Sequence, residues 1–255
     1  SLNLLEMLEK TRGNRFVRRA TELTVVLTFL ATFGLPLFGI LALAIKLESR
    51  GPVFFKQLRL GLLGQPFWVY KFRTMHEQAE LAAAGNVIPI SKSYADPRAT
   101  RVGKILRRFK LDELPQLWNV LLGDMSIVGP RPEDPLIVEQ HYGPLGMETL
   151  LVPPGLSSPG SLYYYTHGEQ HVSADDPVRA YVQSLLPIKL AIDLLYVRRH
   201  SLAGDLKVIL QTAIVIALIA AGRRRFADPA DLPAARQMVA SQPENLVLGS
   251  GISDQ

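Results

Sequence analysis

An uncharged apolar run with a proline near its middle constrains the fold more than any other feature of this sequence. Residues 23–45 contain no charged side chain. A helix needs about 20 apolar residues to cross the hydrocarbon core of a bilayer, so this run is long enough to enter a membrane. Pro36 removes a helical hydrogen bond and crowds the preceding turn. We therefore expect a membrane helix that is kinked or broken near Pro36.

The charges beside this run favour a re-entrant helix over a simple span. The positive-inside rule expects basic residues mainly on one side of a membrane helix. Here both flanks are basic, with Arg12, Arg15, Arg18 and Arg19 before the run and Lys46, Arg50, Lys56 and Arg59 after it. A helix broken at Pro36 that enters and leaves by the same face explains both observations. A proline-kinked transmembrane helix is the alternative.

The remaining patterns predict a mostly helical α+β fold. Two strand-like runs on either side of Gly61–Gly64 indicate a small β-hairpin within residues 53–70. A second, 14-residue apolar run, Val208–Ala221, is followed by Arg223–Arg225, which suits an amphipathic helix at the membrane interface or, equally, a core helix. We divide the chain into a basic amphipathic segment (1–22), a re-entrant helix (23–45), a compact domain with interfacial helices (46–226) and a C-terminal extension (227–255) that is loose apart from one short helix near 232–241.

An acid pair, Asp112 and Glu113, stands at the start of a predicted helix. The apolar spacing of a buried stripe follows it, and Gly123 suits the end of that helix, the stripe being Leu114, Leu117, Trp118, Leu121 and Leu122. The partial positive charge of a helix N-terminus favours ionised carboxylates, the form needed in a nucleophile or a metal ligand. Aspartate is also a common helix cap, and spacing alone favours that plainer role slightly.

Several cations accompany the acid pair. Arg131 lies between Pro130 and Pro132, so its backbone is fixed and its guanidinium suits two-point phosphate binding. Lys71 and Arg73 follow the predicted hairpin, and Arg101, Arg107 and Arg108 precede the acid pair. We expect Lys71, Arg73 and Arg107 to bind substrate phosphate together with Arg131. Carboxylate oxygens beside a phosphate favour Mg²⁺, with Asp112 and Glu113 as ligands. The chain has no cysteine, which excludes thiolate catalysis and cysteine-based zinc sites.

The net charge of +5 suits nucleic acid, anionic lipid or a phosphorylated substrate. The basic residues gather around apolar runs rather than around exposed aromatic residues, so we expect membrane lipid and no nucleic acid as partners. A homodimer is an assembly that the sequence leaves open.

Several long motifs, in order, resemble those of the bacterial sugar transferases, the monotopic polyprenol-phosphate phosphoglycosyl transferases. The resemblance covers about residues 15–220, and its motifs are Ile45–Phe55 with Gln57, Lys71–Met75, Asp96–Arg98 with Thr100–Gly103, Leu111–Pro132, and Lys189, Asp193, Tyr196, Ser201 and Asp205–Lys207.

The resemblance implies an enzyme of the bacterial inner membrane, with its catalytic domain on the cytoplasmic face. Such enzymes move a phosphosugar from a UDP-sugar to polyprenol (undecaprenyl) phosphate, release UMP and begin a cell-surface glycan pathway. It further implies that Asp112 forms a covalent phosphosugar intermediate, that Glu113 is its partner with Mg²⁺, and that Pro36 marks the re-entrant break. The cations that it places at the phosphates are Lys71, Arg107 and Arg131.

This chain departs from the family pattern at two places. Phe109-Lys110 replaces the small hydroxyl residues usual before the acid pair, and the loop Pro154–Gly160 leads into Tyr163–Tyr165. The sugar therefore does not carry over from a relative. Two rival functions are a metal-dependent glycosyltransferase that releases UDP without a covalent intermediate, and a non-enzymatic membrane scaffold in which the acid pair caps a helix.

Overall fold

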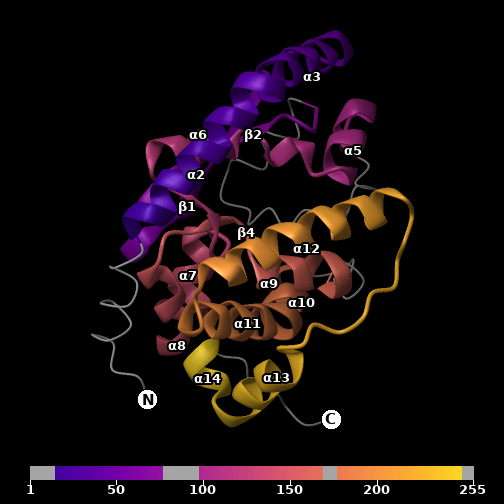
Figure 1. Cartoon of the computed structure of the whole chain (residues 1–255). Helices are drawn as coiled ribbons and strands as arrows, with labels where there is room; N and C mark the ends of the chain where they lie inside the picture. The colour runs from indigo at the N-terminus through magenta and orange to yellow at the C-terminus, as the bar shows by residue number, and fades with distance from the viewer. Residues whose placement is uncertain (1–14, 77–97, 169–176, 249–255) are drawn as a thin grey trace.

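The computed structural model describes residues 15–76, 98–168 and 177–248, and shows a mostly helical molecule with two small sheets. A long bent helix opens the described part (Figure 1). Helix α2, Arg15–Phe29, passes through a π-helical segment, Leu30–Gly34, into α3, Leu35–Glu48. Of the predicted amphipathic segment 1–22, only residues from Arg15 onward lie within the described residues.

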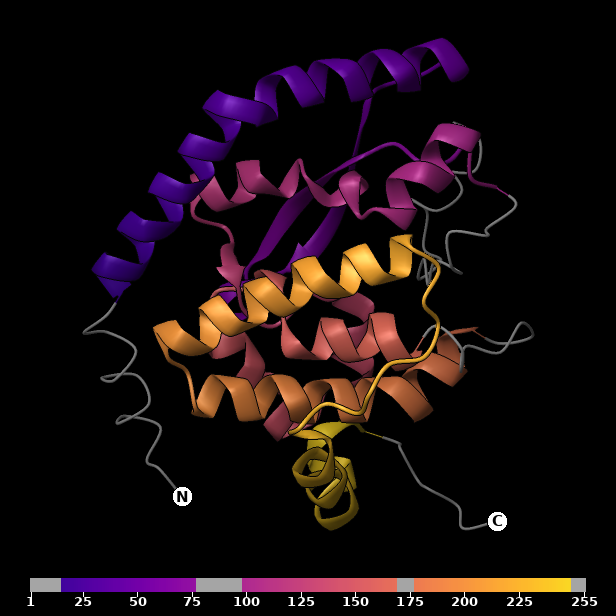
Figure 2. The same ribbon diagram turned by 45° about the vertical axis from the view of Figure 1, so that its right-hand side comes forward.

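The predicted interruption near Pro36 takes the form of a bend within a continuous helix. Pro36 is the second residue of α3, which follows the π-helical segment directly. Because the helix continues through both segments, the missing N–H of Pro36 interrupts the ladder of backbone hydrogen bonds there. Wider π-type turns and proline are recognised causes of helix kinks. Figure 2 shows the axis changing direction between α2 and α3 while the chain stays helical.

The surface of this bent helix is apolar and mostly uncovered. Three described helical stretches are long and apolar enough to cross a membrane, judged by length and composition only: Phe16–Glu48, Val178–Arg198 and Leu202–Ala220. The most apolar windows of the first and third are only 11% buried within the protein, whereas that of the second is 67% buried. Val178–Arg198 is therefore a core helix, and the other two present apolar surface outward.

The predicted hairpin is confirmed. Strands β1, Phe54–Leu60, and β2, Pro66–Phe72, pair antiparallel, with Phe54 opposite Phe72. A 3-10 turn, Leu62–Gly64, joins them. Phe72 is buried against the end of α3 and against α5, Arg101–Arg108, a short basic helix that Thr100 caps.

Helix α6, Gln116–Leu122, follows the acid pair and ends at Gly123 in the left-handed conformation, as predicted. The expected buried stripe is wrong in part. Leu117 is buried and Leu114 and Leu121 are partly buried, but Trp118 and Leu122 are 56% and 58% exposed. A seven-residue helix packed mainly against α2 and β2 has partners for only part of a wide apolar face.

A short parallel sheet follows, made of β3, Ser126–Val128, and β4, Gly155–Ser157. Between its strands lie α7, Pro135–His141, and α8, Pro144–Glu148, followed by a 3-10 turn, Thr149–Leu151. Glycine is required where the chain leaves β3, because a Cβ on Gly129 would lie 2.5 Å from the carbonyl oxygen of Pro153. This close approach fixes the segment that carries Arg131.

The main core forms around α11, Leu186–Arg198, which continues α10, Pro177–Ala180, through a π-helical segment, Tyr181–Leu185. Helix α9, Pro159–Tyr163, packs against it, followed by a π-helical segment, Tyr164–Gly168. The C-terminal part adds α13, Leu232–Ser241, and α14, Pro243–Leu246. The predicted short helix is confirmed, but the segment after it is not loose, because Leu246 and Val247 are fully buried in the core.

Helix α12, Leu202–Ala220, is longer than the uncharged run suggested, because it starts at the capping Ser201 and includes two charged residues. It lies beside α9 (Figure 1). Its only buried residues are Asp205 and Val208, which excludes an ordinary core helix. Asp205 pairs with Arg18 of α2 at 3.3 Å, so an ion pair joins the two helices that expose apolar surface.

Candidate active site

The acid pair lies on a 3-10 turn, Leu111–Glu113, directly before α6, where the sequence placed it. The residue at the cap position of α6 is Pro115, and no side chain caps that end. Asp112 therefore does not serve as the helix cap. Its Oδ1 atom is buried and has no hydrogen-bond partner among the described residues. A buried, unpartnered carboxylate oxygen is costly unless a ligand or ion completes it.

Glu113 is paired with Arg131 at two points. The Nη2 and Nη1 atoms of Arg131 lie 2.6 Å and 3.0 Å from the Oε1 and Oε2 atoms of Glu113. The backbone next to Arg131 is fixed to β4, because the carbonyl oxygen of Pro130 accepts a hydrogen bond from Gly155 N at 2.9 Å. The fork thus ties the turn before α6 to the loop after β3.

The two carboxyl groups differ in electrostatic environment. Burial would raise the pKa of Glu113, but Arg131 and Lys71 hold it well below its ordinary value. Burial and the neighbouring Glu113 charge raise the pKa of Asp112, against Lys110, Lys71 and Arg107. A further positive charge at Asp112 would favour the ionised form that a nucleophile needs.

The structure brings together three of the four predicted phosphate-binding cations. Lys71, Arg107 and Arg131 all act on the charges of the acid pair. Partial burial lowers the pKa of Lys71 to about 8, although Glu113 opposes this shift. Arg107 also donates from Nε to Thr74 Oγ1 at 2.9 Å.

Arg73 lies in a different setting. Its side chain is buried and donates to the carbonyl oxygens of Ser49 and Arg50, at 2.8 Å and 2.5 Å, and to Ser49 Oγ at 2.9 Å. These contacts hold the chain just after α3. Arg73 thus braces the end of the bent helix.

A second charged cluster, centred on Glu133, received no role from the sequence. Glu133 accepts from Lys189 Nζ at 2.6 Å and from Tyr181 Oη at 2.5 Å, and it lies 3.7 Å from Arg59. Burial would raise the pKa of Glu133, but Lys189 and Arg59 bring it down to about 2. The position of Glu133, two residues after Arg131, was the available signal in the sequence.

Asp193 of α11 holds the loop between β4 and α9. It accepts from Gly160 N at 2.8 Å and from Ser158 Oγ at 3.3 Å. Burial raises its pKa to about 6, although Lys189 and the backbone amide of Arg131 oppose this shift. The main core is thereby linked to both β4–α9 and the Arg131 loop.

The residues present fit a hard divalent cation in part. Asp112 offers an unpartnered buried oxygen, whereas both oxygens of Glu113 accept from Arg131. Within residues 15–76, 98–168 and 177–248 no three His, Cys, Asp or Glu side chains cluster as a metal site. Magnesium is commonly held by one or two carboxylates together with substrate phosphates, and Asp112 suits that arrangement.

Fold and site define a class of protein that exposes apolar helices and surrounds an acid pair with basic side chains. Residues 13–218 match the family described as bacterial sugar transferase. The chain belongs to this family.

Curated relatives agree with that assignment. The undecaprenyl-phosphate glucose phosphotransferase of Komagataeibacter xylinus is 37% identical over 83% of this chain and 38% of its own length. The UDP-N-acetylgalactosamine-undecaprenyl-phosphate N-acetylgalactosaminephosphotransferase of Aeromonas hydrophila is 37% identical over 77% of this chain and 43% of its length. The UDP-glucose:undecaprenyl-phosphate glucose-1-phosphate transferase of Caulobacter vibrioides is 37% identical over 76% of this chain and 67% of its own length. The match thus spans less than half of the first two relatives.

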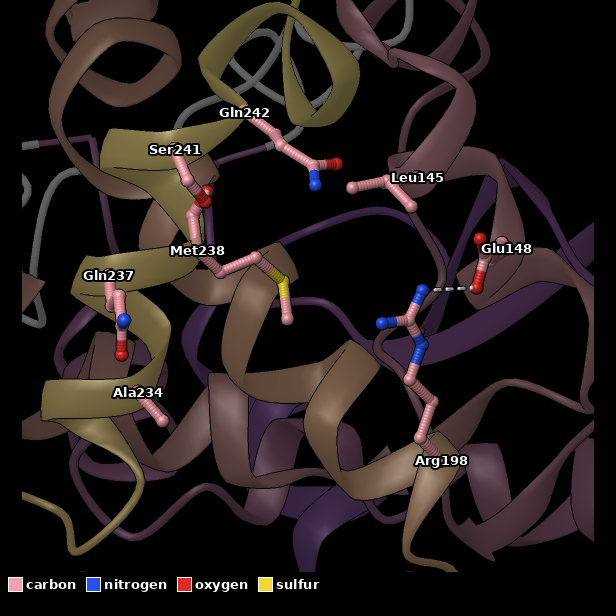
Figure 3. Close-up of a pocket in the computed structure, with 8 residues that line it drawn as sticks. All are labelled: Leu145, Glu148, Arg198, Ala234, Gln237, Met238, Ser241 and Gln242. Carbon is pink, nitrogen blue, oxygen red and sulfur yellow. Dashed lines mark hydrogen bonds and ion pairs between the residues drawn. The ribbon is translucent and has the colours of Figure 1, made fainter. Parts of the chain in front are cut away.

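A cavity of about 570 Å³ lies apart from the acid pair, among α8, α11 and α13 (Figure 3). Its lining includes the ion pair between Arg198 and Glu148, 2.9 Å apart. Five of its eight lining residues lie after residue 218, beyond the segment that matches the family. Most of this cavity is therefore built from residues outside the part of the chain that matches the family.

Proposed function

We propose that this chain transfers a sugar-1-phosphate from a UDP-sugar to undecaprenyl phosphate and releases UMP. The observation that carries the proposal is the buried, unpartnered Oδ1 of Asp112 beside the paired Glu113 and Arg131. The relatives' names supply the substrate class. The product is the first lipid-linked unit of a cell-surface glycan.

The reaction proceeds in two displacements at one phosphorus atom. Asp112 attacks the sugar-bearing phosphate, an aspartyl oxygen–phosphorus bond forms, and the bond to UMP breaks with its electron pair leaving on UMP. A phosphate oxygen of undecaprenyl phosphate then attacks the same phosphorus, and the Asp112 carboxylate leaves. Splitting the transfer this way lets a water-soluble donor and a lipid acceptor react in turn.

Charge neutralisation and positioning are the main requirements of phosphoryl transfer. Lys71 and Arg107 supply positive charge beside Asp112, and their effect on its carboxyl is already favourable to ionisation. Arg131 holds Glu113 by two hydrogen bonds, so Glu113 orients the site rather than offering a free oxygen. When bound, Mg²⁺ would neutralise the donor diphosphate, and Asp112 is the residue suited to hold it.

The proposed membrane arrangement places the site at the cytoplasmic face of the bacterial inner membrane. The bent α2–α3 helix serves as a re-entrant anchor that enters and leaves by this face, and α12 lies along the interface. Basic flanks on both sides of residues 23–45, the kink before Pro36 and the uncovered apolar surfaces support this arrangement.

Purified protein offered a panel of UDP-sugars with undecaprenyl phosphate tests the proposal by the nucleotide that it releases. UMP release that requires both substrates supports the transferase. UDP as the nucleotide product would favour the non-covalent glycosyltransferase, and no turnover in detergent or in lipid with any sugar would favour the scaffold.

A further inference from the structure

Lys110 has a backbone conformation that most residues avoid. Its φ of 54° and ψ of 23° are left-handed, and Leu63 is the only other non-glycine residue with positive φ in the described ranges. A left-handed non-glycine residue is strained and is often found at functional sites. This residue starts the turn that carries Asp112. Its side chain points to the other unusual segment near the site.

That segment is the π-helical stretch Tyr164–Gly168, which continues α9. The Lys110 Nζ lies 3.8 Å from the centroid of the Tyr165 ring. Such a distance is well within the range of an attractive cation–π contact. Single π-helical turns within helices also occur frequently at functional sites.

Tyr165 has a second contact at its other end. Its hydroxyl oxygen accepts from Arg131 Nη1 at 3.2 Å, and the same nitrogen donates to Glu113 Oε2 at 3.0 Å. One aromatic side chain therefore contacts two cations, one at its face and one at its hydroxyl. These cations approach the acid pair from different segments, Lys110 from before Asp112 and Arg131 from after β3.

We propose that Tyr165 is a positioning residue that fixes the Lys110 ammonium and the Arg131 guanidinium on two sides of the acid pair, so that together they hold the diphosphate of the sugar donor. This inference rests on the proposed function. It assigns to Lys110 a direct contact with the anionic donor and to Tyr165 an action through the two cations. Lys110 and Tyr165 lie at the two places where the sequence departs from the family pattern.

The test measures how fast Asp112 captures phosphosugar in a single turnover with excess UDP-sugar and no lipid acceptor. Lys110→Met is made in three backgrounds: the unchanged chain, Tyr165→Phe and Tyr165→Leu. Phenylalanine keeps the aromatic face and loses the hydroxyl, whereas leucine loses both. We expect Lys110→Met to slow donor capture about tenfold in the first two backgrounds and to have no further effect beside Tyr165→Leu.

Lys110→Gly separates this role from a structural one. Glycine adopts the left-handed conformation without strain, so the variant should be at least as stable as the unchanged chain. It should nevertheless capture donor about tenfold more slowly, with the KM for undecaprenyl phosphate unchanged, and Lys110→Arg should restore most of the rate. Matched controls are Tyr163→Phe, whose ring stacks on His167, and Lys56→Met, whose ammonium lies over Trp68.

Three results would overturn the inference: normal donor capture by Lys110→Gly, an equal effect of Lys110→Met beside Tyr165→Leu, or equal losses in the controls. Failure of the proposed function looks different. In that case neither the unchanged chain nor any of the variants forms a phosphosugar adduct.

Discussion

The guanidinium of Arg131 and the carboxylate of Glu113 meet in a two-bonded fork, with donor–acceptor distances of 2.6 Å and 3.0 Å. This contact joins the turn that carries Asp112 to the loop after β3. Lysine has one ammonium and cannot form the fork. We expect Arg131→Lys to reduce kcat about 100-fold and to lower the free energy of unfolding by about 1–3 kcal/mol.

An exposed ion pair with a single hydrogen bond provides the control for this substitution. Arg199 lies 3.0 Å from Asp231, with side chains 66% and 45% exposed. Arg199→Lys should change turnover and unfolding little, because exposed ion pairs contribute at most about 1 kcal/mol. Steady-state kinetics and chemical denaturation of both variants check the prediction. Equal effects of the two substitutions would show that the fork at Glu113 has no special role.

Lys71 gives the proposed reaction a specific dependence on pH. Partial burial, opposed by Glu113, brings its pKa to about 8, so its ammonium is lost as the pH rises through 8. If this charge assists phosphate binding, kcat/KM falls over the same range. Lys71→Arg keeps the charge, because arginine stays protonated above pH 12. The variant should retain its activity at pH 9 relative to pH 7, and an unchanged alkaline decline would assign that decline to another group.

Asp193 gives the folded state a pH dependence of its own. Its pKa of about 6 is above its ordinary value of 3.8, chiefly because of burial. The folded state therefore binds more protons than the unfolded state between these values, and its stability falls as the pH rises from about 4 to 6. The loss is on the order of 3 kcal/mol.

Asp193→Asn removes this titration and keeps an oxygen that can accept from Gly160 N. Unfolding midpoints of both proteins at pH 4.5 and pH 7 check the sign. The unchanged chain should lose more stability than the variant between these two values. If the variant loses as much stability as the unchanged chain, the loss belongs to groups other than Asp193. The low pKa of Glu133 affects stability mainly below this pH range.

The absence of cysteine makes the membrane anchor easy to map. Ala20 and Arg50 are both exposed and lie near the two ends of the bent helix. Single-cysteine variants Ala20→Cys and Arg50→Cys are labelled with a membrane-impermeant maleimide in inside-out and right-side-out vesicles. A re-entrant helix predicts that both sites react only in inside-out vesicles. Labelling from opposite faces would instead establish a kinked span.

Local patterns predicted much of the fold. Strand-like runs on either side of Gly61–Gly64 predicted the hairpin, and Gly123 correctly marked the end of the helix after the acid pair. Burial was harder to predict, because it depends on partners distant in the sequence. Trp118 and Leu122 follow a core-like spacing and remain exposed, whereas Val247 lies outside any strong pattern and is fully buried.

The site was predicted to a similar extent. Asp112, Glu113 and Arg131 share one stretch of sequence, so their proximity could be inferred from local spacing and resemblance. The buried setting of Arg73 could not, since it depends on where the chain after α3 returns. The contact of Tyr165 with both Lys110 and Arg131 likewise exists only after folding.

The mass of the intact chain after incubation with its UDP-sugar, without lipid acceptor, tests the central claim most directly. The account predicts an added mass equal to one phosphosugar, located on Asp112 by peptide fragmentation and discharged by undecaprenyl phosphate. Asp112→Asn should gain no mass and should not turn over. Full turnover by Asp112→Asn, or release of UDP from an unmodified chain, would contradict the covalent mechanism.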